Sequence, residues 1–183
     1  MYGMVNQAIK TMVIETVDNE TWVDVCKSLN VSTNDFDSFE QHSDQLTLDL
    51  VGVICKKLDI EPVALLESFG EYWIKYAMQS EYKTILVSFG ETPLELINSL
   101  DSLHTRLELT FDNLDPPSFH TTIISDQEVI VHYNSNRDMP LEFFVIGLLK
   151  GIFKLFNMKC SVEILDESGG DKARFRIRFW HEN

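Results

Sequence analysis

Cysteine is scarce in this sequence, and nothing in it marks a secreted chain. The three cysteines, Cys26, Cys55 and Cys160, lie far apart and form no closely spaced metal-binding pattern. An odd number of cysteines suits reduced thiols better than a disulfide framework. The first ten residues have neither a basic start followed by an apolar run nor a small-residue cleavage site, so no secretory signal is expected. We therefore predict a cytoplasmic protein.

The sequence also lacks a long uninterrupted apolar run. Its most apolar segment covers residues 141–158, and Glu142, Lys150 and Lys154 interrupt it. Charged side chains are costly inside hydrocarbon. The segment is predicted to be a buried helix, and no membrane span is expected.

Positive charge is in short supply as well. Only 15 Lys and Arg stand against 29 Asp and Glu, which gives a formal net charge of -14. A field of that sign repels phosphate backbones, so we expect no nucleic-acid partner. The sequence has no glycine-rich phosphate loop, nucleophile elbow or paired His-Glu zinc motif, and we therefore do not expect an enzyme.

The residues that are present predict a folded α+β protein. The chain has 183 residues, of which 44% are hydrophobic, enough for one domain or two small lobes with a real core. Apolar spacing and end signals predict helices first and two hairpins later. The helices are expected over 2–17, 21–29, 44–57, 61–77, 93–109 and 141–156, and the hairpins over 119–135 and 159–181. This order indicates a single antiparallel sheet.

His104 lies on the apolar face of the helix that Thr92, Pro93 and Glu95 are expected to start. Apolar residues recur around it at helical spacing, at Ile97, Leu100, Leu107 and Phe111. One interpretation, the commoner for a lone histidine, is a buried neutral imidazole whose N–H bonds to a backbone carbonyl. The other is a metal ligand. No second ligand lies one turn away, which disfavours a zinc cage, whereas a haem iron needs only one protein ligand.

Tyr133, Ser135 and Arg137 alternate at the end of a predicted strand. Extended geometry aims alternate side chains at the same side. Two hydroxyls and a guanidinium suit paired carboxylates, such as porphyrin propionates. A simple polar strand end is the competing interpretation.

Small and rigid residues mark two further places. Gly147 and Gly151 share a helix face, where a flat molecule or another backbone could approach closely, with helix packing the commoner cause. Pro116 and Pro117 fix a corner, which by itself is only a turn.

Taken together, these residues resemble the H-NOX domain, the haem nitric oxide/oxygen-binding module that also occurs in soluble guanylate cyclase. The resemblance covers essentially the whole chain, and its most specific element is His104 followed about thirty residues later by Tyr133-x-Ser135-x-Arg137. The other motifs in family order are Met1-Tyr2-Gly3, Phe69-Gly70-Glu71-Tyr72-Trp73, Leu100-Asp101-Ser102-Leu103 and Pro116-Pro117.

The resemblance implies one domain over residues 1–183, with a helical lobe at about 1–65 and a lobe with a four-stranded antiparallel sheet at about 66–183. It implies a ferrous haem b (iron protoporphyrin IX) between the lobes. By the same resemblance His104 is the proximal iron ligand and metal ligand, Tyr133, Ser135 and Arg137 bind the propionates, and Pro117 presses on the porphyrin and helps to distort it.

The resemblance also assigns the pocket for the gas. Its residues are Val5, Ile9, Trp73, Ala77, Phe144 and Leu148. Oxygen-binding members have a tyrosine where Phe144 stands here. A charge-assisted donor contributes roughly 1.5–3 kcal/mol, about ten- to a hundredfold in affinity, so oxygen should bind poorly without one. Nitric oxide, and carbon monoxide in vitro, are therefore the expected ligands, while the indole N–H of Trp73 is left as a possible donor.

The function implied by the resemblance is a gas sensor. Nitric oxide would bind opposite His104, release that histidine and relax the haem, and the change would be signalled to a separate histidine kinase or cyclic-di-GMP enzyme. Two alternatives stay open at this stage: a haem-free α+β protein-interaction module with His104 in its core, and an oxygen-binding haem protein.

Overall fold

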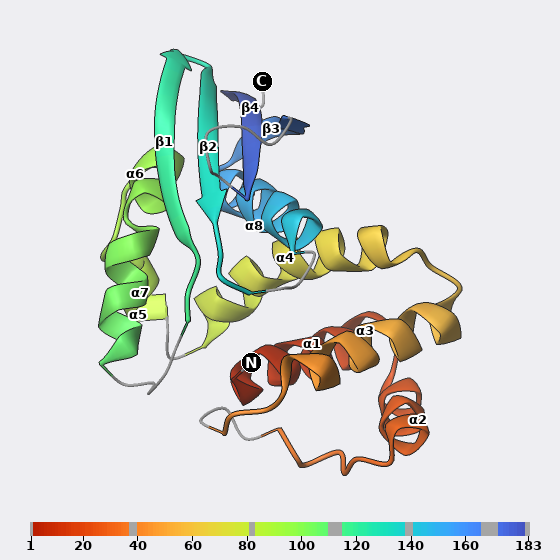
Figure 1. Ribbon diagram of the computed structural model, residues 1–183. Helices are drawn as coiled ribbons and strands as arrows, with labels where there is room; N and C mark the ends of the chain where they lie inside the picture. Colours follow the sequence, from red (N-terminus) through yellow and green to blue (C-terminus); the bar gives the residue numbers. More distant parts are fainter. Residues whose placement is uncertain are drawn as a thin grey trace. The chain divides into compact units, whose positions relative to one another are not determined.

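The computed structural model describes residues 2–36, 40–80, 83–109, 115–137, 141–165 and 172–181. The chain forms two compact units, Met1–Phe69 and Gly70–Asn183. Figure 1 shows their elements along the chain. The division falls inside one long helix, α4 (Pro62–Gln79), a few residues after the lobe boundary expected near residue 65.

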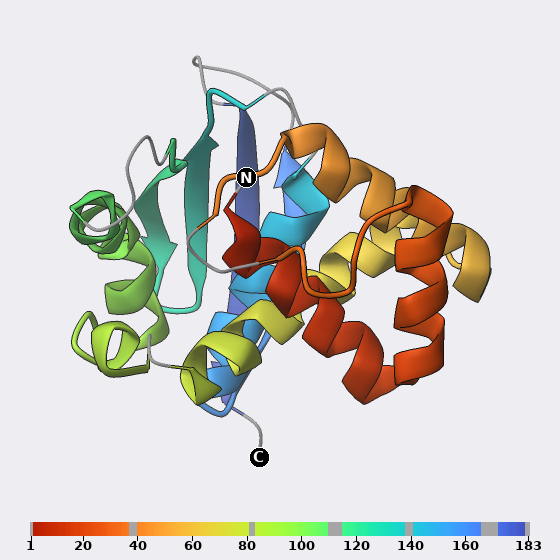
Figure 2. The ribbon, with the colours of Figure 1, turned by 90° about the horizontal axis from the view of Figure 1, so that it is seen from below.

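The first unit is helical. It contains α1 (Gly3–Thr16), α2 (Asn19–Leu29), α3 (Asp44–Leu58) and the first half of α4. The side chains of Asp18 and Ser43 cap α2 and α3 by accepting hydrogen bonds from Thr21 N and Leu46 N. Helix α2 packs against α1 and α3 around the fully buried Trp22 (Figure 2). All four helices were expected from their apolar spacing.

The second unit combines helices with a sheet. After α4 come the helices α5 (Lys83–Val87), α6 (Pro93–Asn98) and α7 (Leu100–Glu108), then the strands β1 (Ser118–Ser125) and β2 (Glu128–Asn134). Helix α8 (Glu142–Leu155) precedes β3 (Met158–Leu165) and β4 (Ala173–His181). The four strands form one antiparallel sheet in the order β1-β2-β4-β3. The predicted α+β class with a four-stranded antiparallel sheet is confirmed.

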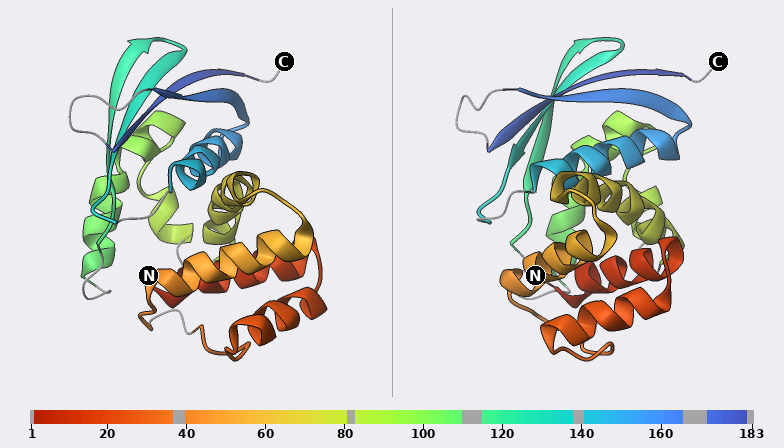
Figure 3. Two further views of the ribbon diagram at one scale, coloured as in Figure 1. Left: turned by 45° about the vertical axis from the view of Figure 1, so that its right-hand side comes forward. Right: turned by 90° about the vertical axis from the view of Figure 1, so that its right-hand side faces the viewer.

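One face of this sheet is buried and the other is not. Val129, Val131 and Tyr133 of β2 alternate with less buried residues, and Phe175 and Ile177 of β4 continue the buried face. Helices α6 and α8 pack on the same side of the sheet, as both views in Figure 3 show. The hydrophobic core of the unit therefore lies between this sheet face and the helices.

Helices α4 and α8 approach each other unusually closely at two glycines. A Cβ atom at Gly70 would lie 2.1 Å from the carbonyl oxygen of Phe144 and 2.6 Å from Leu148 N. A Cβ atom at Gly151 would lie 2.9 Å from Ile74 Cγ1. The groove expected at Gly147 and Gly151 is therefore occupied by another helix, so packing is its cause.

Three local predictions need correction. The helix expected over 93–109 is divided at Ser99, whose N–H donates to the carbonyls of both Glu95 (3.0 Å) and Leu96 (3.2 Å), a tightened turn between α6 and α7. Helix α5 was not expected, because its five residues are too few to establish a period. Strand β2 ends at Asn134, so Ser135 lies beyond it. Phe111 lies outside the described residues.

In the part of the chain that the structure describes, every helix is too short or too polar to traverse a lipid bilayer. The three cysteines are free thiols, with Cys26 and Cys55 buried and Cys160 half-buried.

Candidate functional site

His104 lies on α7, one turn after Asp101. The Asp101 carboxylate accepts a hydrogen bond of 2.8 Å from the backbone N–H of Phe119, the second residue of β1. Residues three apart share a helix face, so Asp101 and His104 both face the start of this strand. The ring centroids of His104 and Phe119 are 6.4 Å apart. The tether from Asp101 to β1 thus fixes the position of the imidazole relative to the sheet.

The burial of His104 differs from the expectation that it points fully into an apolar core. The side chain is half-buried, and its neighbour Leu103 is the buried residue of that turn. The Nδ1 atom of His104 is nevertheless buried and makes no short hydrogen bond among the described residues, although the backbone of Pro117 acts on the ring as a hydrogen-bond acceptor. Asn6 Nδ2 and Trp22 Nε1 are buried without a hydrogen bond as well, so this feature is not confined to His104.

The surroundings of His104 keep its imidazole neutral. Burial lowers the pKa of His104, and the Asp101 carboxylate, the backbone of Pro117 and the Glu108 carboxylate oppose this shift without reversing it. Neutral imidazole is the form that binds metals. The backbone of Pro117 contributes through a hydrogen bond with the imidazole, the kind of contact expected for a buried core histidine.

Tyr133 lies on the inner face of β2 and is almost completely buried, with 1% of its surface exposed. Its ring packs between those of Phe119, with centroids 5.4 Å apart, and Phe175, at 6.3 Å. Burial raises the pKa of Tyr133, while a hydrogen bond with the Ser135 side chain and the charge of Arg137 lower it. The hydroxyls of Tyr133 and Ser135 are therefore hydrogen-bonded to each other, and the positive charge of Arg137 favours the ionised form of the Tyr133 hydroxyl.

Arg137 lies in the segment after β2, which folds back on Asp115. The Arg137 N–H donates to Ser135 Oγ (3.2 Å), and its Nε donates to the carbonyl oxygen of Asp115 (3.2 Å). Asn136 Nδ2 also donates to Asp115 Oδ1 (3.1 Å). Because Asp115 precedes Pro117 by two residues, these bonds bring the Tyr133, Ser135 and Arg137 group close to the corner beside His104.

The predicted pocket residues of the second unit lie on two helices. Trp73 and Ala77 are one turn apart on α4, and Phe144 and Leu148 are one turn apart on α8. The rings of Trp73 and Phe144 meet edge to face, with centroids 6.4 Å apart. This contact joins the predicted residues of α4 to those of α8. The remaining two predicted pocket residues, Val5 and Ile9, lie on α1 in the first unit, and Ile9 is buried there.

Sequence reasoning missed three residues around this site: Tyr76, Asp101 and Asp115. The Tyr76 ring lies 6.1 Å from that of Trp73, and burial raises the pKa of its phenol. Because Tyr76 follows Trp73 by three residues, the sequence could have predicted that both side chains lie on the same face of the helix. Asp101 was quoted only as part of a motif, although a carboxylate one turn before the histidine was visible. No sequence signal pointed to the Asp115 carbonyl.

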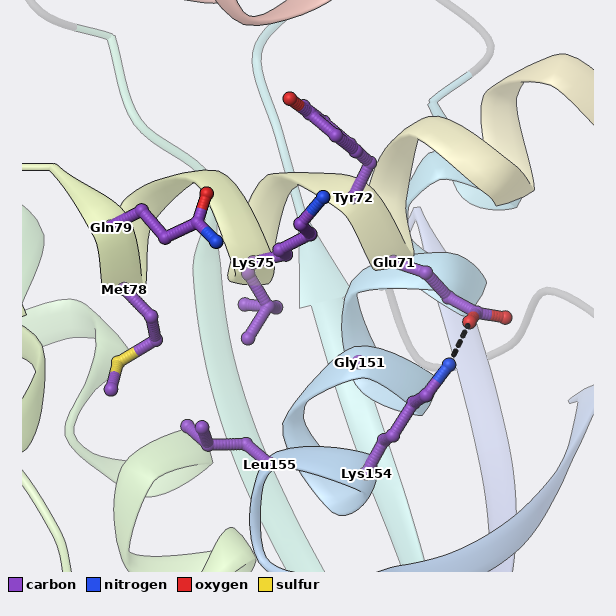
Figure 4. Close-up of a pocket in the computed structure, with 9 residues that line it drawn as sticks. Glu71, Tyr72, Lys75, Met78, Gln79, Gly151, Lys154 and Leu155 are labelled. Atoms are coloured by element: carbon purple, nitrogen blue, oxygen red, sulfur yellow. Dashed lines mark ion pairs between the residues drawn. The ribbon is translucent and has the colours of Figure 1, made fainter. Parts of the chain in front are cut away.

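A second feature of α4 and α8 lies apart from these residues. It is a cavity of about 490 Å³ that contains none of the predicted site residues (Figure 4). An ion pair between Lys154 Nζ and Glu71 Oε2, 3.6 Å apart, lies at one side of it, and Lys75 Nζ lies 5.2 Å from the centre of the Tyr72 ring. Its lining consists of Glu71, Tyr72, Ile74, Lys75, Met78, Gln79, Gly151, Lys154 and Leu155.

Within the described ranges, no group of three or more His, Cys, Asp and Glu side chains could hold a metal ion on its own. A single histidine can still ligate a metal when a macrocycle supplies the other ligands, as in haem. The residues present fit that arrangement, since the neutral imidazole of His104 is accompanied in the same unit by the hydroxyls of Tyr133 and Ser135 and the guanidinium of Arg137.

Comparison with known proteins identifies the family. Residues 2–164 match the model of the Haem-NO-binding family. The soluble guanylate cyclase gcy-31 of Caenorhabditis elegans is 30% identical over 168 residues, which cover 91% of this chain and 24% of that protein. The guanylate cyclase soluble subunit beta-2 of Rattus norvegicus is 34% identical over 104 residues, which cover 56% of this chain and 15% of that protein.

Solved structures share the fold at low sequence identity. An H-NOX protein from S. oneidensis in the Fe(II) ligation state superposes with a TM-score of 0.86 at 16% identity, covering 100% of this chain and 98% of that one. The unliganded Fe(II) H-NOX protein from K. algicida gives a TM-score of 0.79 at 18% identity, covering 100% and 98% of the two chains.

This chain belongs to the Haem-NO-binding (H-NOX) family. Family membership confirms the predicted resemblance, and it confirms haem as the cofactor class. The chain spans about a quarter or less of the length of these curated relatives, so the match concerns their haem domain and not the whole cyclases.

Proposed function

We propose that His104 is the iron ligand and that this domain is a haem-based sensor of nitric oxide. The observation that supports this best is that the surroundings of His104 keep its imidazole neutral, the form that binds metals, in a chain that belongs to the Haem-NO-binding family. When bound, haem would supply an iron that can take a diatomic gas. The chain's own residues would hold that cofactor, select the gas and pass on the change.

Tyr133, Ser135 and Arg137 would bind the propionates. Charge-assisted hydrogen bonds from a guanidinium are the strong ones, and two hydroxyls in mutual contact add further donors. The bonds from Arg137 to Ser135 and to the Asp115 carbonyl fix the segment that carries these donors. Pro117, whose backbone acts on the His104 imidazole, would bound the cofactor on the histidine side and help to distort it.

The apolar wall of Trp73, Ala77, Phe144 and Leu148, with Val5 and Ile9 on α1, would select the gas. Phe144 offers no hydrogen-bond donor where a hydroxyl would stabilise bound dioxygen. Nitric oxide, and carbon monoxide in vitro, need no such donor. The indole of Trp73, whose ring contacts that of Phe144, and the phenol of Tyr76, whose ring lies beside that of Trp73, are the polar groups through which this selectivity could be altered.

The structural change that accompanies gas binding would be transmitted through α7. This helix carries His104 and is tied to β1 by the bond between Asp101 and Phe119. If His104 were released from the cofactor it would hold, α7 would be free to move and would change the surface around β1, which a separate effector would recognise. We propose a histidine kinase or a cyclic-di-GMP enzyme as that effector. The three free thiols support a cytoplasmic location.

The absorption spectrum of the purified protein tests this proposal. We expect a Soret band at one haem per chain, a shift of that band when nitric oxide is added to the reduced protein, and no stable spectrum of an oxygen complex in air. A stably folded but colourless protein would instead support the haem-free interaction module. A stable oxygen complex would support the oxygen-binding alternative and contradict the assignment of Phe144.

A further inference from the structure

The segment that follows β2 and carries Arg137 is bonded to two other parts of the chain. One is Asp115, whose carbonyl oxygen accepts a hydrogen bond from Arg137 Nε and whose carboxylate accepts one from Asn136. The other is Lys172, the residue directly before β4. Asp115 and Lys172 lie 22 and 35 residues from Arg137 along the chain. The position of Arg137 is therefore set by the folded unit and not by its own segment alone.

Lys172 is fixed by its backbone at the end of the pairing between β2 and β4. The two strands pair antiparallel, and the pairing reaches Tyr133 and Ala173 (Figure 1). The backbone N–H of Lys172, one residue earlier, donates to the carbonyl oxygen of Tyr133 (3.0 Å) and to Asn134 Oδ1 (3.0 Å). The hydrogen bonds of the sheet thus extend to Lys172, so its side chain starts from a defined place beside the end of β2.

The side chain of Lys172 connects this place to Arg137. Its Nζ donates a hydrogen bond to the backbone carbonyl oxygen of Arg137, and both residues are half-buried. Hydrogen bonds from an ammonium group are charge-assisted and stronger than neutral ones. Both backbone polar groups of Arg137 are therefore bonded, the N–H to Ser135 Oγ and the carbonyl to Lys172. Without Lys172, the carbonyl end of Arg137 loses this connection to the sheet.

We propose that Lys172 is a positioning residue of the propionate site, which holds the backbone of Arg137 in the place from which its guanidinium binds. The inference rests on the proposed function, in which Arg137 binds a propionate. A guanidinium pairs with a carboxylate in a defined geometry, so a displaced Arg137 backbone weakens the pair although the charge is still present. Lys172 acts through Arg137 and is not itself a propionate ligand.

Haem loss in a double-substitution cycle tests this role. Lys172→Met removes the donor but keeps a long side chain, and we expect it to accelerate haem transfer to apomyoglobin about three- to tenfold. Lys172→Arg keeps a charged donor and should stay within about twofold of the unsubstituted protein. In an Arg137→Ala background, Lys172→Met should add less than about twofold, because the residue through which it acts is already gone.

Two companion variants separate positioning from other effects. Lys159→Met, at an exposed position of β3, removes the same charge from the same sheet and should leave the rate unchanged. Lys172→Gln, whose shorter side chain reaches less far, should accelerate haem loss like Lys172→Met. Urea unfolding of each haem-free variant is measured in parallel, and we expect all of them to remain folded.

Four results would overturn the proposal. They are unchanged haem loss in Lys172→Met, failure of Lys172→Arg to retain haem, a full additional effect of Lys172→Met in the Arg137→Ala background, and unfolding of both Lys172→Met and Lys172→Gln. The haem content of the unsubstituted protein is recorded on the same samples. With haem bound there at one per chain, any of these results rejects only the role of Lys172, whereas a colourless unsubstituted protein rejects the proposed function and this inference with it.

Discussion

At the scale of single residues, His104 illustrates how a small environment sets a chemical role. Its apolar neighbours are enough to keep the imidazole neutral, and the tether from Asp101 to β1 holds it in place. The sequence singled out this histidine and left two interpretations open, a core histidine and a metal ligand. The groups that surround the ring, such as the backbone of Pro117, come from distant parts of the chain and so are invisible to helical periodicity.

Replacing His104 with glycine should abolish stable haem binding, and free imidazole should restore it. The variant removes the only proposed protein ligand of the iron, while imidazole in solution can occupy the vacated position. Soret absorbance of the variant, with and without imidazole, measures the effect. His132→Gly, on the outer sheet face, serves as the control and should keep its haem. An unchanged iron spectrum in His104→Gly would mean that another residue is the ligand.

Arg137→Ala should accelerate haem loss about ten- to a hundredfold, because a charge-assisted hydrogen bond contributes roughly 1.5–3 kcal/mol. Transfer of haem to apomyoglobin measures the rate. Lys56→Ala, on α3, removes one positive charge elsewhere and should leave the rate unchanged. Haem loss at the same speed in both variants would place the propionates away from Arg137.

The lowered pKa of His104 predicts a pH dependence in the haem-free protein. The unfolded chain binds the proton more readily than the folded one, so this contribution to stability is present above the ordinary histidine pKa of about 6.5 and is lost as the pH falls below it. The free energy of unfolding in urea should therefore decrease between neutral and mildly acidic pH by less in His104→Gln than in the unsubstituted chain. An identical decrease would argue against the shift.

At the scale of elements, the sequence predicted the long segments well and the short ones poorly. The helices of the first unit and α8 have clear apolar periods, and the strands have clear turn residues between them. Helix α5 is too short for any period, and the division at Ser99 arises from a shared N–H that no residue type announces. The close contact of α4 with α8 needed two distant glycines to be paired, which a single sequence does not specify.

Gly70→Ala should destabilise the protein by about 1–3 kcal/mol, because the new methyl group would collide with the backbone of α8. Gly52→Ala is the matched control in α3, where nothing lies within 4 Å of the added atom, and it should be neutral or stabilising by about 1 kcal/mol through helix propensity. Chemical denaturation of the two variants provides the comparison. Similar effects at both positions would show that α4 and α8 tolerate separation.

At the scale of the whole molecule, charge is the dominant feature, and the sequence alone established it. What composition could not reveal is its distribution, since Arg174, Arg176 and Arg178 come to lie on one sheet face only through the alternation of side chains along β4. The pairing of site residues is also a property of the folded unit, because the contact between Arg137 and Asp115 joins residues 22 apart in the chain. The matches cover 24% and 15% of the two cyclases that were compared, so their activity does not carry over to this domain, and the partner that it signals to has to be found by experiment.

Self-repulsion should make stability depend on salt. A formal net charge of -14 destabilises the compact state, and ions screen that repulsion with a Debye length of about 10 Å at 0.1 M ionic strength. The melting temperature of the haem-free protein should rise as sodium chloride is added from a low starting concentration. A fall would show that the ion pairs, such as those of Glu128, contribute more than the repulsion costs.

The contact at Gly70 and Gly151 has one more consequence. Elsewhere in the core, side chains can change rotamer and absorb a small displacement, but at Gly70 the backbone of α4 lies directly against the backbone of α8, and at Gly151 the backbone of α8 lies against Ile74 and Glu71. The adjoining stretches of α4 and α8 must therefore travel together as a rigid pair. Any rearrangement that accompanies gas binding in this unit has to be taken up at the ends of these two helices or in the segments that connect them to the sheet.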